Sequence, residues 1–257
     1  MYTIAYFSPT GNAKHVANRL AHILKGNVTE IFPLEFKDPL TLNTPDHLVI
    51  LYPIHGFNAS RTVRRWARAL PEDHSAKVSL LAVGCTTTWL NDAASLALRQ
   101  PLEKKGYTIV VDEVIAMPLT FIMAFPDDVI HDQLDEMETR LGGIATRLGG
   151  AQEPEKVVPV KAKLMSAIGK VESPAARLFG LELYANDDCI SCGTCWRNCP
   201  EGNIKQSSKD KPSFSFNCLM CMRCIYSCQQ KAISPRFSKF IPIKSGYNLK
   251  RHLANEP

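Results

Sequence analysis

Eight of the nine cysteines lie between residues 189 and 228, in two copies of the pattern C-x2-C-x2-C-x3-C. Cysteine thiolates are strong metal ligands, and thiols in a chain without an export signal favour metal or redox chemistry over disulfide bonds. Zinc normally uses two separated cysteine pairs and four ligands per ion, so the third close cysteine of each copy is superfluous for zinc. The spacing therefore favours iron–sulfur clusters, with zinc as the alternative. The copies are Cys189, Cys192, Cys195 and Cys199, and Cys218, Cys221, Cys224 and Cys228.

The doubled motif resembles that of bacterial two-cluster ferredoxins, in which the fourth cysteine of each motif binds the other cluster. The resemblance implies two [4Fe-4S] clusters, one held by Cys189, Cys192, Cys195 and Cys228 and the other by Cys218, Cys221, Cys224 and Cys199. Pro200 follows the first motif as it does in ferredoxins, whereas Gln229 stands at that place in the second. Gly193 is expected to supply the backbone freedom that a tight ligand loop needs.

A second chemical pattern, Ser-Pro-Thr-Gly-Asn-Ala-Lys over residues 8–14, follows the first expected strand and opens a helix. Hydroxyls and a glycine at a helix N-terminus form an anion site, although an ordinary helix cap is the alternative. The segment lacks the glycine-rich motifs of nucleoside triphosphatases and dinucleotide-binding folds. It resembles the phosphate loop of flavodoxins, written S/T-x-T-G-N-T, which binds the phosphate of FMN. The resemblance implies that FMN phosphate is held by Ser8, Thr10, Gly11, Asn12 and Ala13, with Ala13 in place of the last threonine.

Two more loops follow expected strand ends, as the flavodoxin resemblance requires, and both are expected to flank the isoalloxazine ring of FMN. His55, Phe57 and Trp89 are the candidates for stacking on the ring, and backbone groups near Gly56 and Thr86 for bonding its polar edge. The alternatives are an ordinary loop histidine, a core Phe57 and a Cys85 that is simply a small buried hydrophobe. The two loops contain Pro53, Ile54, His55, Gly56 and Phe57, and Gly84, Cys85, Thr86 and Trp89.

Short apolar runs alternate with helical patterns from Tyr2 to about Gly150, the rhythm of a parallel α/β sheet. The expected strands are 2–7, 27–32, 47–52, 77–83 and 107–115, and the expected helices are 14–24, 60–70, 91–105 and 127–148. This pattern predicts an α/β flavodoxin-like doubly wound parallel sheet of order 2-1-3-4-5, followed by a small α+β two-cluster ferredoxin domain.

The division by chemistry predicts four regions. They are a flavodoxin-like FMN-binding domain over 1–150, a linker and helical bridge over 151–183, the ferredoxin domain over 184–238 and a basic tail over 239–257. The bridge is amphipathic from 161 to 183, with Leu164, Ile168, Val171, Leu178, Phe179 and Leu181 available to pack. A helix that docks the two domains is the main interpretation, and a membrane-surface helix is the alternative.

Composition limits the function classes. The net charge is +5, with the excess from Lys156 onward, and the basic residues are not interleaved with aromatic ones as a nucleic-acid surface requires. The start of the chain does not read as an export signal, and no apolar run reaches the roughly 20 residues of a membrane span, so we expect a cytoplasmic location. Four arginines form either a solvated helix face or a docking patch for an acidic donor: Arg61, Arg64, Arg65 and Arg68.

The whole chain thus resembles flavodoxin–ferredoxin fusion proteins, which implies electron relay between FMN and two [4Fe-4S] clusters. The expected partner is a redox protein or a small-molecule electron donor or acceptor. Two alternatives remain open. One is an FMN-dependent reductase of a small molecule, for which His55 is the evident acid, and the other is a redox-sensing binding module.

Overall fold

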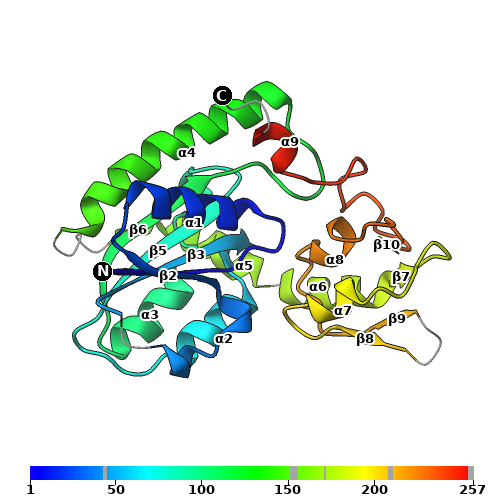
Figure 1. The fold of residues 1–257 in the computed structure, drawn as a ribbon, viewed down its shortest axis with the longest axis horizontal. Helices are drawn as coiled ribbons and strands as arrows, with labels where there is room; N and C mark the ends of the chain where they lie inside the picture. Colours follow the sequence, from blue (N-terminus) through cyan, green and yellow to red (C-terminus); the bar gives the residue numbers. More distant parts are fainter. Residues whose placement is uncertain (43–44, 151–155, 171, 208–210, 254–257) are drawn as a thin grey trace. The chain divides into compact units, whose positions relative to one another are not determined.

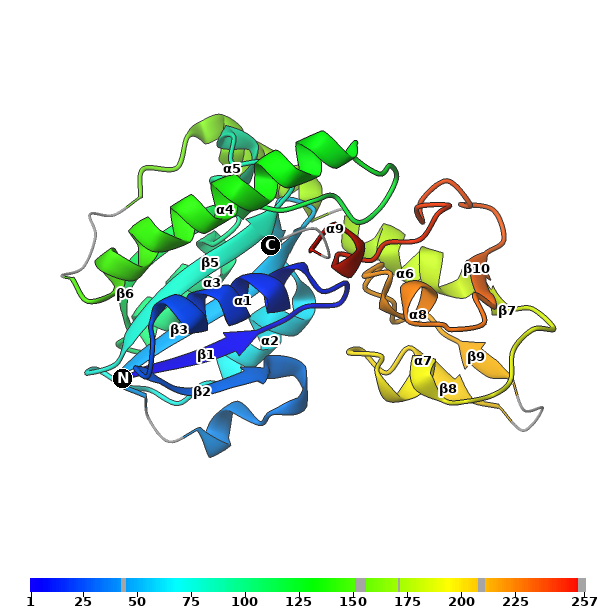
Figure 2. The ribbon, with the colours of Figure 1, turned by 45° about the horizontal axis from the view of Figure 1, so that its top comes forward.

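The computed structural model describes residues 1–42, 45–150, 156–170, 172–207 and 211–253, which form two compact units (Figures 1 and 2). The first unit comprises Met1–Pro118 and Asp127–Lys170, and the second comprises Leu119–Pro126 and Val171–Pro257. These units do not follow the predicted ranges at two places. Residues 119–126 are part of the second unit, and the first half of the predicted bridge is part of the first.

The first unit contains a six-stranded sheet with helices on both faces. Its strands are β1 (Tyr2–Tyr6), β2 (Val28–Pro33), β3 (His47–His55), β4 (Asn58–Ala59), β5 (Lys77–Gly84) and β6 (Thr108–Ala116). Its α-helices are α1 (Asn12–Ile23), α2 (Arg61–Ala69), α3 (Leu96–Lys104), α4 (Asp127–Leu148) and α5 (Val160–Gly169), and its short 3-10 turns are η1 (Leu34–Phe36), η2 (Pro39–Thr41) and η3 (Trp89–Asn91).

The five main strands are parallel in the order β2-β1-β3-β5-β6, and the short β4 pairs antiparallel with the end of β3. Apart from β4, this is the predicted 2-1-3-4-5 order of the flavodoxin-like class, which is thereby confirmed. The register aligns Tyr2 with His47 and His47 with Lys77, so β1, β3 and β5 begin together. Their carboxyl ends consequently meet at one edge of the sheet.

The sheet is covered on both faces, with α1 and α4 on one side and α2 and α3 on the other (Figure 1). Continuous burial along β3 and β5 explains why their sequences are apolar without alternation. Wholly buried aliphatic side chains on the central strands form the core, among them Ile4, Leu48, Ile50, Leu51, Leu80 and Leu81.

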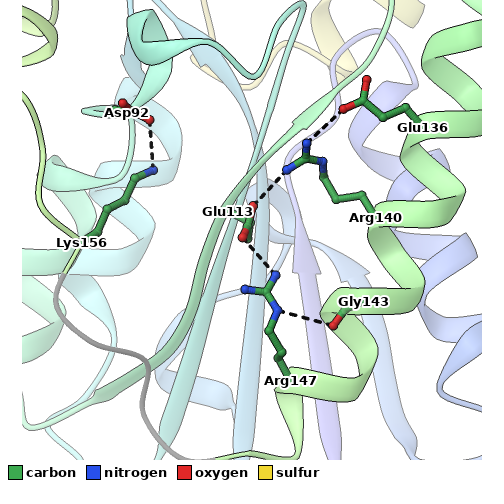
Figure 3. A network of polar contacts seen from close by, with 7 residues as sticks. All are labelled: Asp92, Glu113, Glu136, Arg140, Gly143, Arg147 and Lys156. Atoms are coloured by element: carbon green, nitrogen blue, oxygen red, sulfur yellow. Dashed lines mark hydrogen bonds and ion pairs between the residues drawn. The ribbon is translucent and has the colours of Figure 1, made fainter.

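Ion pairs join α4 to the edge strand β6 (Figure 3). Glu113 on β6 accepts hydrogen bonds from Arg140 at 3.4 Å and Arg147 at 3.0 Å, and Arg140 also pairs with Glu136 at 3.0 Å. All four side chains are partly exposed, so the network contributes modestly to stability and fixes the direction of α4.

Two elements differ from their predicted bounds. β3 continues three residues beyond Tyr52 because it folds back on β4 in a hairpin, with Ile54 opposite Ala59. α3 begins at Leu96, five residues later than predicted, because Asn91 is held by a hydrogen bond from its side chain to the Thr86 carbonyl at 2.7 Å. Neither contact is a local property of the sequence.

The second unit is small and built from short elements. They are α6 (Glu172–Glu182), β7 (Leu183–Ala185), α7 (Thr194–Arg197), β8 (Ile204–Gln206), β9 (Pro212–Phe214), α8 (Arg223–Tyr226), β10 (Ile233–Pro235) and α9 (Lys250–Leu253). β7 pairs antiparallel with β10, and β8 pairs antiparallel with β9. Each half of the unit therefore carries one short helix inside its cysteine motif.

Residues 119–126 are tied to this unit by hydrogen bonds and packing. The Ile122 N–H donates to the Ile241 carbonyl at 2.6 Å, and the Tyr226 hydroxyl donates to the Thr120 carbonyl at 2.8 Å. Phe121 packs on the cluster formed by Phe179, Leu183 and Met222. The start of the predicted basic tail thus packs on the cysteine-rich unit. Among the residues that the structure describes, no helix has the length and apolar character needed to cross a membrane.

Candidate cofactor sites

The cysteines of the second unit line two cavities. One cavity is lined by the first three cysteines of the first motif together with the last cysteine of the second: Cys189, Cys192, Cys195 and Cys228. The other is lined by Cys218, Cys221, Cys224 and Cys199. The structure therefore brings together the two quartets that the ferredoxin resemblance implies, with the fourth cysteine exchanged between motifs.

The two ligand loops share one backbone conformation. Left-handed residues occur at the same three offsets in both motifs: Ser191, Gly193 and Gly202 in the first, with φ of 52°, 82° and 60°, and Met220, Met222 and Lys231 in the second, with φ of 53°, 60° and 51°. Gly193 and Met222 each precede the short helix of their motif. The expected backbone role of Gly193 is thus a role of the position, which the second motif gives to a methionine.

Amide hydrogen bonds to sulfur are also repeated. The Asn203 N–H donates to Cys199 Sγ and the Ala232 N–H donates to Cys228 Sγ, both at 3.3 Å and both four residues after the sulfur's own residue. The Met220 N–H donates to Cys218 Sγ at 3.2 Å. N–H donors favour a charged thiolate, so these loops are suited to cysteines that bind metal.

Burial has the opposite effect on the thiols. It raises the pKa of Cys195 to about 11 and that of Cys221 to about 12, and it also raises the pKa of Cys224. Thiolates at these places therefore need compensating positive charge within the cavity, and iron supplies that charge.

The spacing of the quartets bears on the zinc alternative. Among the described residues, which include all eight motif cysteines, no three His, Cys, Asp or Glu side chains converge closely enough to hold one metal ion. A tetrahedral zinc site draws its sulfurs together on bonds of about 2.3 Å. The four thiols of each cavity are instead arranged around a larger group, which fits a four-iron cluster better than an ion.

The predicted phosphate loop joins β1 to α1. Gly11 has φ of 110° and directly precedes the helix, and a Cβ at this glycine would meet no atom within 4 Å. The loop is therefore open on the side of the missing side chain. The first N–H groups of α1 have no partner within the helix and attract an anion. The backbone at Gly11 and Ala13 thus fits a phosphate.

Two side chains of this loop already have structural bonds. Ser8 Oγ accepts a hydrogen bond from the Lys14 N–H at 2.9 Å, and Asn12 Nδ2 donates to the Pro118 carbonyl at 2.8 Å. Asn12 and Ala13 are buried, whereas Thr10 is half-buried. Of the predicted side chains, Thr10 is therefore the best placed to donate to a phosphate, and Ser8 and Asn12 shape the loop.

The loop after β3 is a tight hairpin turn. Gly56 and Phe57 have φ of 53° and 59°, the signature of a two-residue turn whose central residues are both left-handed. Pro53, Ile54, His55 and Phe57 are all half-buried, so Phe57 is not a core residue. The Gly56 carbonyl accepts a hydrogen bond from Asn58 Nδ2 at 2.7 Å.

The loop after β5 lies beside this hairpin. A Cβ at Gly84 would be 3.0 Å from Ile54 Cδ1, so the glycine lets the two loops pack closely. The Cys85 carbonyl accepts a bond from Gln133 Nε2 at 3.0 Å, and burial raises the pKa of the Cys85 thiol. Cys85 is therefore a protonated, half-buried side chain. Trp89 is 38% exposed, and its ring lies 4.4 Å from Lys161 Nζ of α5.

The predicted α2 arginines divide into two pairs. Arg65 and Arg68 are exposed, whereas Arg61 and Arg64 are half-buried, and burial lowers the pKa of Arg64. A docking role for this helix stays a prediction.

Comparison with known proteins adds a family for the second unit. Residues 175–233 match the family described as "4Fe-4S dicluster domain". This segment is a 4Fe-4S dicluster domain. The match spans both cysteine motifs and the strands β7 to β10 in part or whole, and no curated protein matches the chain.

Solved structures similar to the chain include flavodoxins. An archaeal flavodoxin shares 12% identity, with 58% of this chain and 99% of that chain covered and a TM-score of 0.39. A Pseudomonas aeruginosa flavodoxin shares 16% identity over 58% and 99%, with a TM-score of 0.42. A Fusobacterium nucleatum flavodoxin bound to flavin mononucleotide shares 14% over 58% and 96%, with a TM-score of 0.42. The flavodoxin-like assignment of the first unit rests on its strand order. The chain therefore joins a flavodoxin-like unit to a 4Fe-4S dicluster domain.

One feature at the flavodoxin-like loops was not predicted. Helix α5 covers the hairpin after β3, with Ser166 bonded to Asn58 and Gly169 against the Gly56 carbonyl. The small residues Ala162, Ser166 and Gly169 recur along one face of this helix, and that spacing was the available signal for a close approach.

Proposed function

We propose that this chain is an electron-transfer flavo-iron–sulfur protein that relays electrons between two [4Fe-4S] clusters and FMN. The observation that carries the proposal is the exchange of Cys199 and Cys228 between the two cavities, which is the ligand arrangement of two-cluster ferredoxins. An open anion loop at the carboxyl edge of a flavodoxin-like sheet supports the flavin half.

In this proposal each residue set has a defined task. The eight motif cysteines hold the clusters, and the N–H groups of Met220, Asn203 and Ala232 stabilise the sulfur charge. The backbone at Gly11 and Ala13, with the Thr10 hydroxyl, binds the phosphate. The loops at Gly56 and Cys85 flank the ring, with His55, Phe57 and Trp89 beside it.

When bound, FMN would supply exchange of one electron with clusters and of two with an organic partner or a nicotinamide. The protein residues determine where the cofactors bind and what surrounds them. The donor or acceptor outside the chain is proposed to be a redox protein or a small molecule.

The test is cofactor content followed by electron transfer. Protein purified without oxygen should contain about eight iron ions and one FMN per chain. Reduction of the clusters with a deazaflavin photoreductant at low dose should be followed by bleaching of the flavin absorbance. Iron-replete protein that binds no FMN, or FMN that stays oxidised beside reduced clusters, would overturn the relay.

A variant at the phosphate loop separates the two halves of the proposal. Gly11→Ala forces a side chain into a φ of 110°, so FMN affinity should fall about tenfold or more while the iron content stays unchanged. Gly142→Ala, on α4 with open space around it, is the matched control and should change neither quantity.

A further inference from the structure

Helix α5 exposes its large apolar side chains and buries its small ones. Val160, Leu164 and Ile168 recur every four residues and are 82%, 61% and 53% exposed, and Val157 just before the helix is 90% exposed. The face turned to the first unit carries Ala162 and Ser166, which are buried. The apolar stripe (Val157, Val160, Leu164 and Ile168) is therefore directed away from the unit to which the helix is docked.

The docking of α5 is specific, so the stripe is a fixed feature of this unit. Asn58 Nδ2 donates to the Ser166 carbonyl at 2.9 Å, and Ser166 Oγ donates to Asn58 Oδ1 at 2.6 Å. A Cβ at Gly169 would lie 1.7 Å from the Gly56 carbonyl oxygen, so helix and hairpin are in backbone contact. Rotation of the helix to bury the stripe would break these contacts.

Lysines lie on both margins of the stripe. At 100° per residue, Lys161 lies on one side of the stripe, and Lys163 and Lys170 lie on the other. Residues 156–170 contain four lysines and no aspartate or glutamate. Asp92 pairs with Lys156 at 3.6 Å, and Lys161 lies over the Trp89 ring.

An apolar stripe bordered by lysines is the pattern of a helix that lies in the interface of a membrane. The aliphatic stems of lysine extend along the apolar surface while the ammonium groups reach lipid phosphates. A second copy of the same face would bring lysines of like charge together. The positive border therefore requires a negatively charged occupant.

We propose that the apolar stripe of α5 binds the surface of an anionic phospholipid membrane, with its side chains in the acyl boundary and its lysines at the headgroups. This attachment is peripheral and independent of the proposed electron relay. It places the hairpin at Gly56 and the loop at Trp89, to which α5 is docked, next to the membrane surface.

The test is flotation of the full-length, cofactor-loaded protein with vesicles. It should float with vesicles of phosphatidylglycerol and phosphatidylcholine and stay behind with vesicles of phosphatidylcholine alone. Leu164→Ser should lower the partition coefficient about tenfold. Leu40→Ser is the matched control, because Leu40 is 68% exposed on η2, and it should leave binding unchanged.

A charge reversal tests the lysine margin. Lys163→Glu should lower binding to the anionic vesicles about tenfold, whereas Lys104→Glu, an exposed lysine on α3, should lower it much less. Unchanged circular dichroism and iron content establish that each variant is folded. Absence of flotation, or equal flotation of the Leu164 and Leu40 variants, would overturn the proposal. So would a Leu164-dependent complex with an acidic protein, or a Leu164-dependent dimer, formed by a chain that does not bind vesicles.

Discussion

Individual residues in the two ligand loops show how one backbone is built from different sequences. Gly202 and Lys231 stand at the same offset from the last cysteine of their motifs, with φ of 60° and 51°. A Cβ at Gly202 would meet no atom within 4 Å, so only the backbone conformation opposes a side chain there. The pair therefore isolates the energy of the left-handed conformation from packing.

Exchanging the residue type at these two positions should have opposite effects. Gly202→Ala should lower the free energy of unfolding by about 1 kcal/mol, because alanine is strained at positive φ. Lys231→Gly removes the same strain and should be neutral or slightly stabilising. The midpoint of anaerobic guanidinium unfolding, followed by cluster absorbance, measures both. Equal midpoints for Gly202→Ala and the parent protein would contradict the strain argument.

A buried histidine gives the first unit a pH dependence. His47 is 4% exposed, and its Nε2 lies 2.9 Å from Ser79 Oγ. Burial lowers the pKa of His47 to about 4, assisted by the charges of Lys77 and the N-terminus, while a backbone bond with Leu148 acts in the opposite direction. Between about pH 6.5 and 4 the unfolded histidine binds a proton that the folded one does not.

Stability is therefore present above pH 6.5 and is lost as the pH falls toward 4. The pKa difference corresponds to about 3 kcal/mol in the free energy of unfolding. His47→Gln should show a smaller fall between about pH 7 and about pH 4.5 than the parent protein, because carboxylates titrate equally in both. Urea unfolding followed by circular dichroism at the two pH values provides the comparison. Parallel falls would exclude His47 as the source.

At the level of elements, the docking of α5 depends on a backbone contact. Gly169 is placed where any side chain would collide with the Gly56 carbonyl, which belongs to a rigid two-residue turn. Gly142 is also helical but has open space around it. The two glycines therefore distinguish close approach from helix propensity.

Gly169→Ala should weaken the docking of α5 by about 1–3 kcal/mol, since neither backbone can move freely. Amides of residues 160–169 should then exchange with solvent about tenfold faster or more, measured by hydrogen exchange and mass spectrometry. Gly142→Ala should stabilise α4 by up to about 1 kcal/mol and leave exchange in α5 unchanged. Slower exchange in α5 after Gly169→Ala would show that propensity outweighs the contact.

For the whole molecule, the sequence predicted what depends on local pattern and missed what depends on distant contacts. The strands and their order follow from buried apolar runs such as those of β3 and β5, and the position of Gly11 follows from the loop motif. The late start of α3 depends on the Asn91 bond to Thr86. The assignment of residues 119–126 to the second unit depends on Tyr226, more than a hundred residues away. Periodicity carries no information about either contact.

The exchange of cysteines between motifs makes the second unit a single interlocked structure, and one tryptophan can report on it. Trp196 lines the cavity of Cys189, Cys192, Cys195 and Cys228 and does not line the other. A cluster in that cavity should quench the Trp196 fluorescence by energy transfer. Cys228→Ser should therefore raise the emission, and Cys199→Ser should leave it low, although Cys199 is the closer of the two in sequence.

Each variant should retain about four of about eight iron ions, so that the emission difference is read at equal iron content. Trp196→Phe in both backgrounds gives the constant contribution of Trp66 and Trp89. If each motif kept its own fourth cysteine, the result would be reversed, with emission rising for Cys199→Ser alone. Loss of all iron from both variants would instead contradict two separate clusters. Sequence distance and cavity lining thus make opposite predictions for the same pair of substitutions.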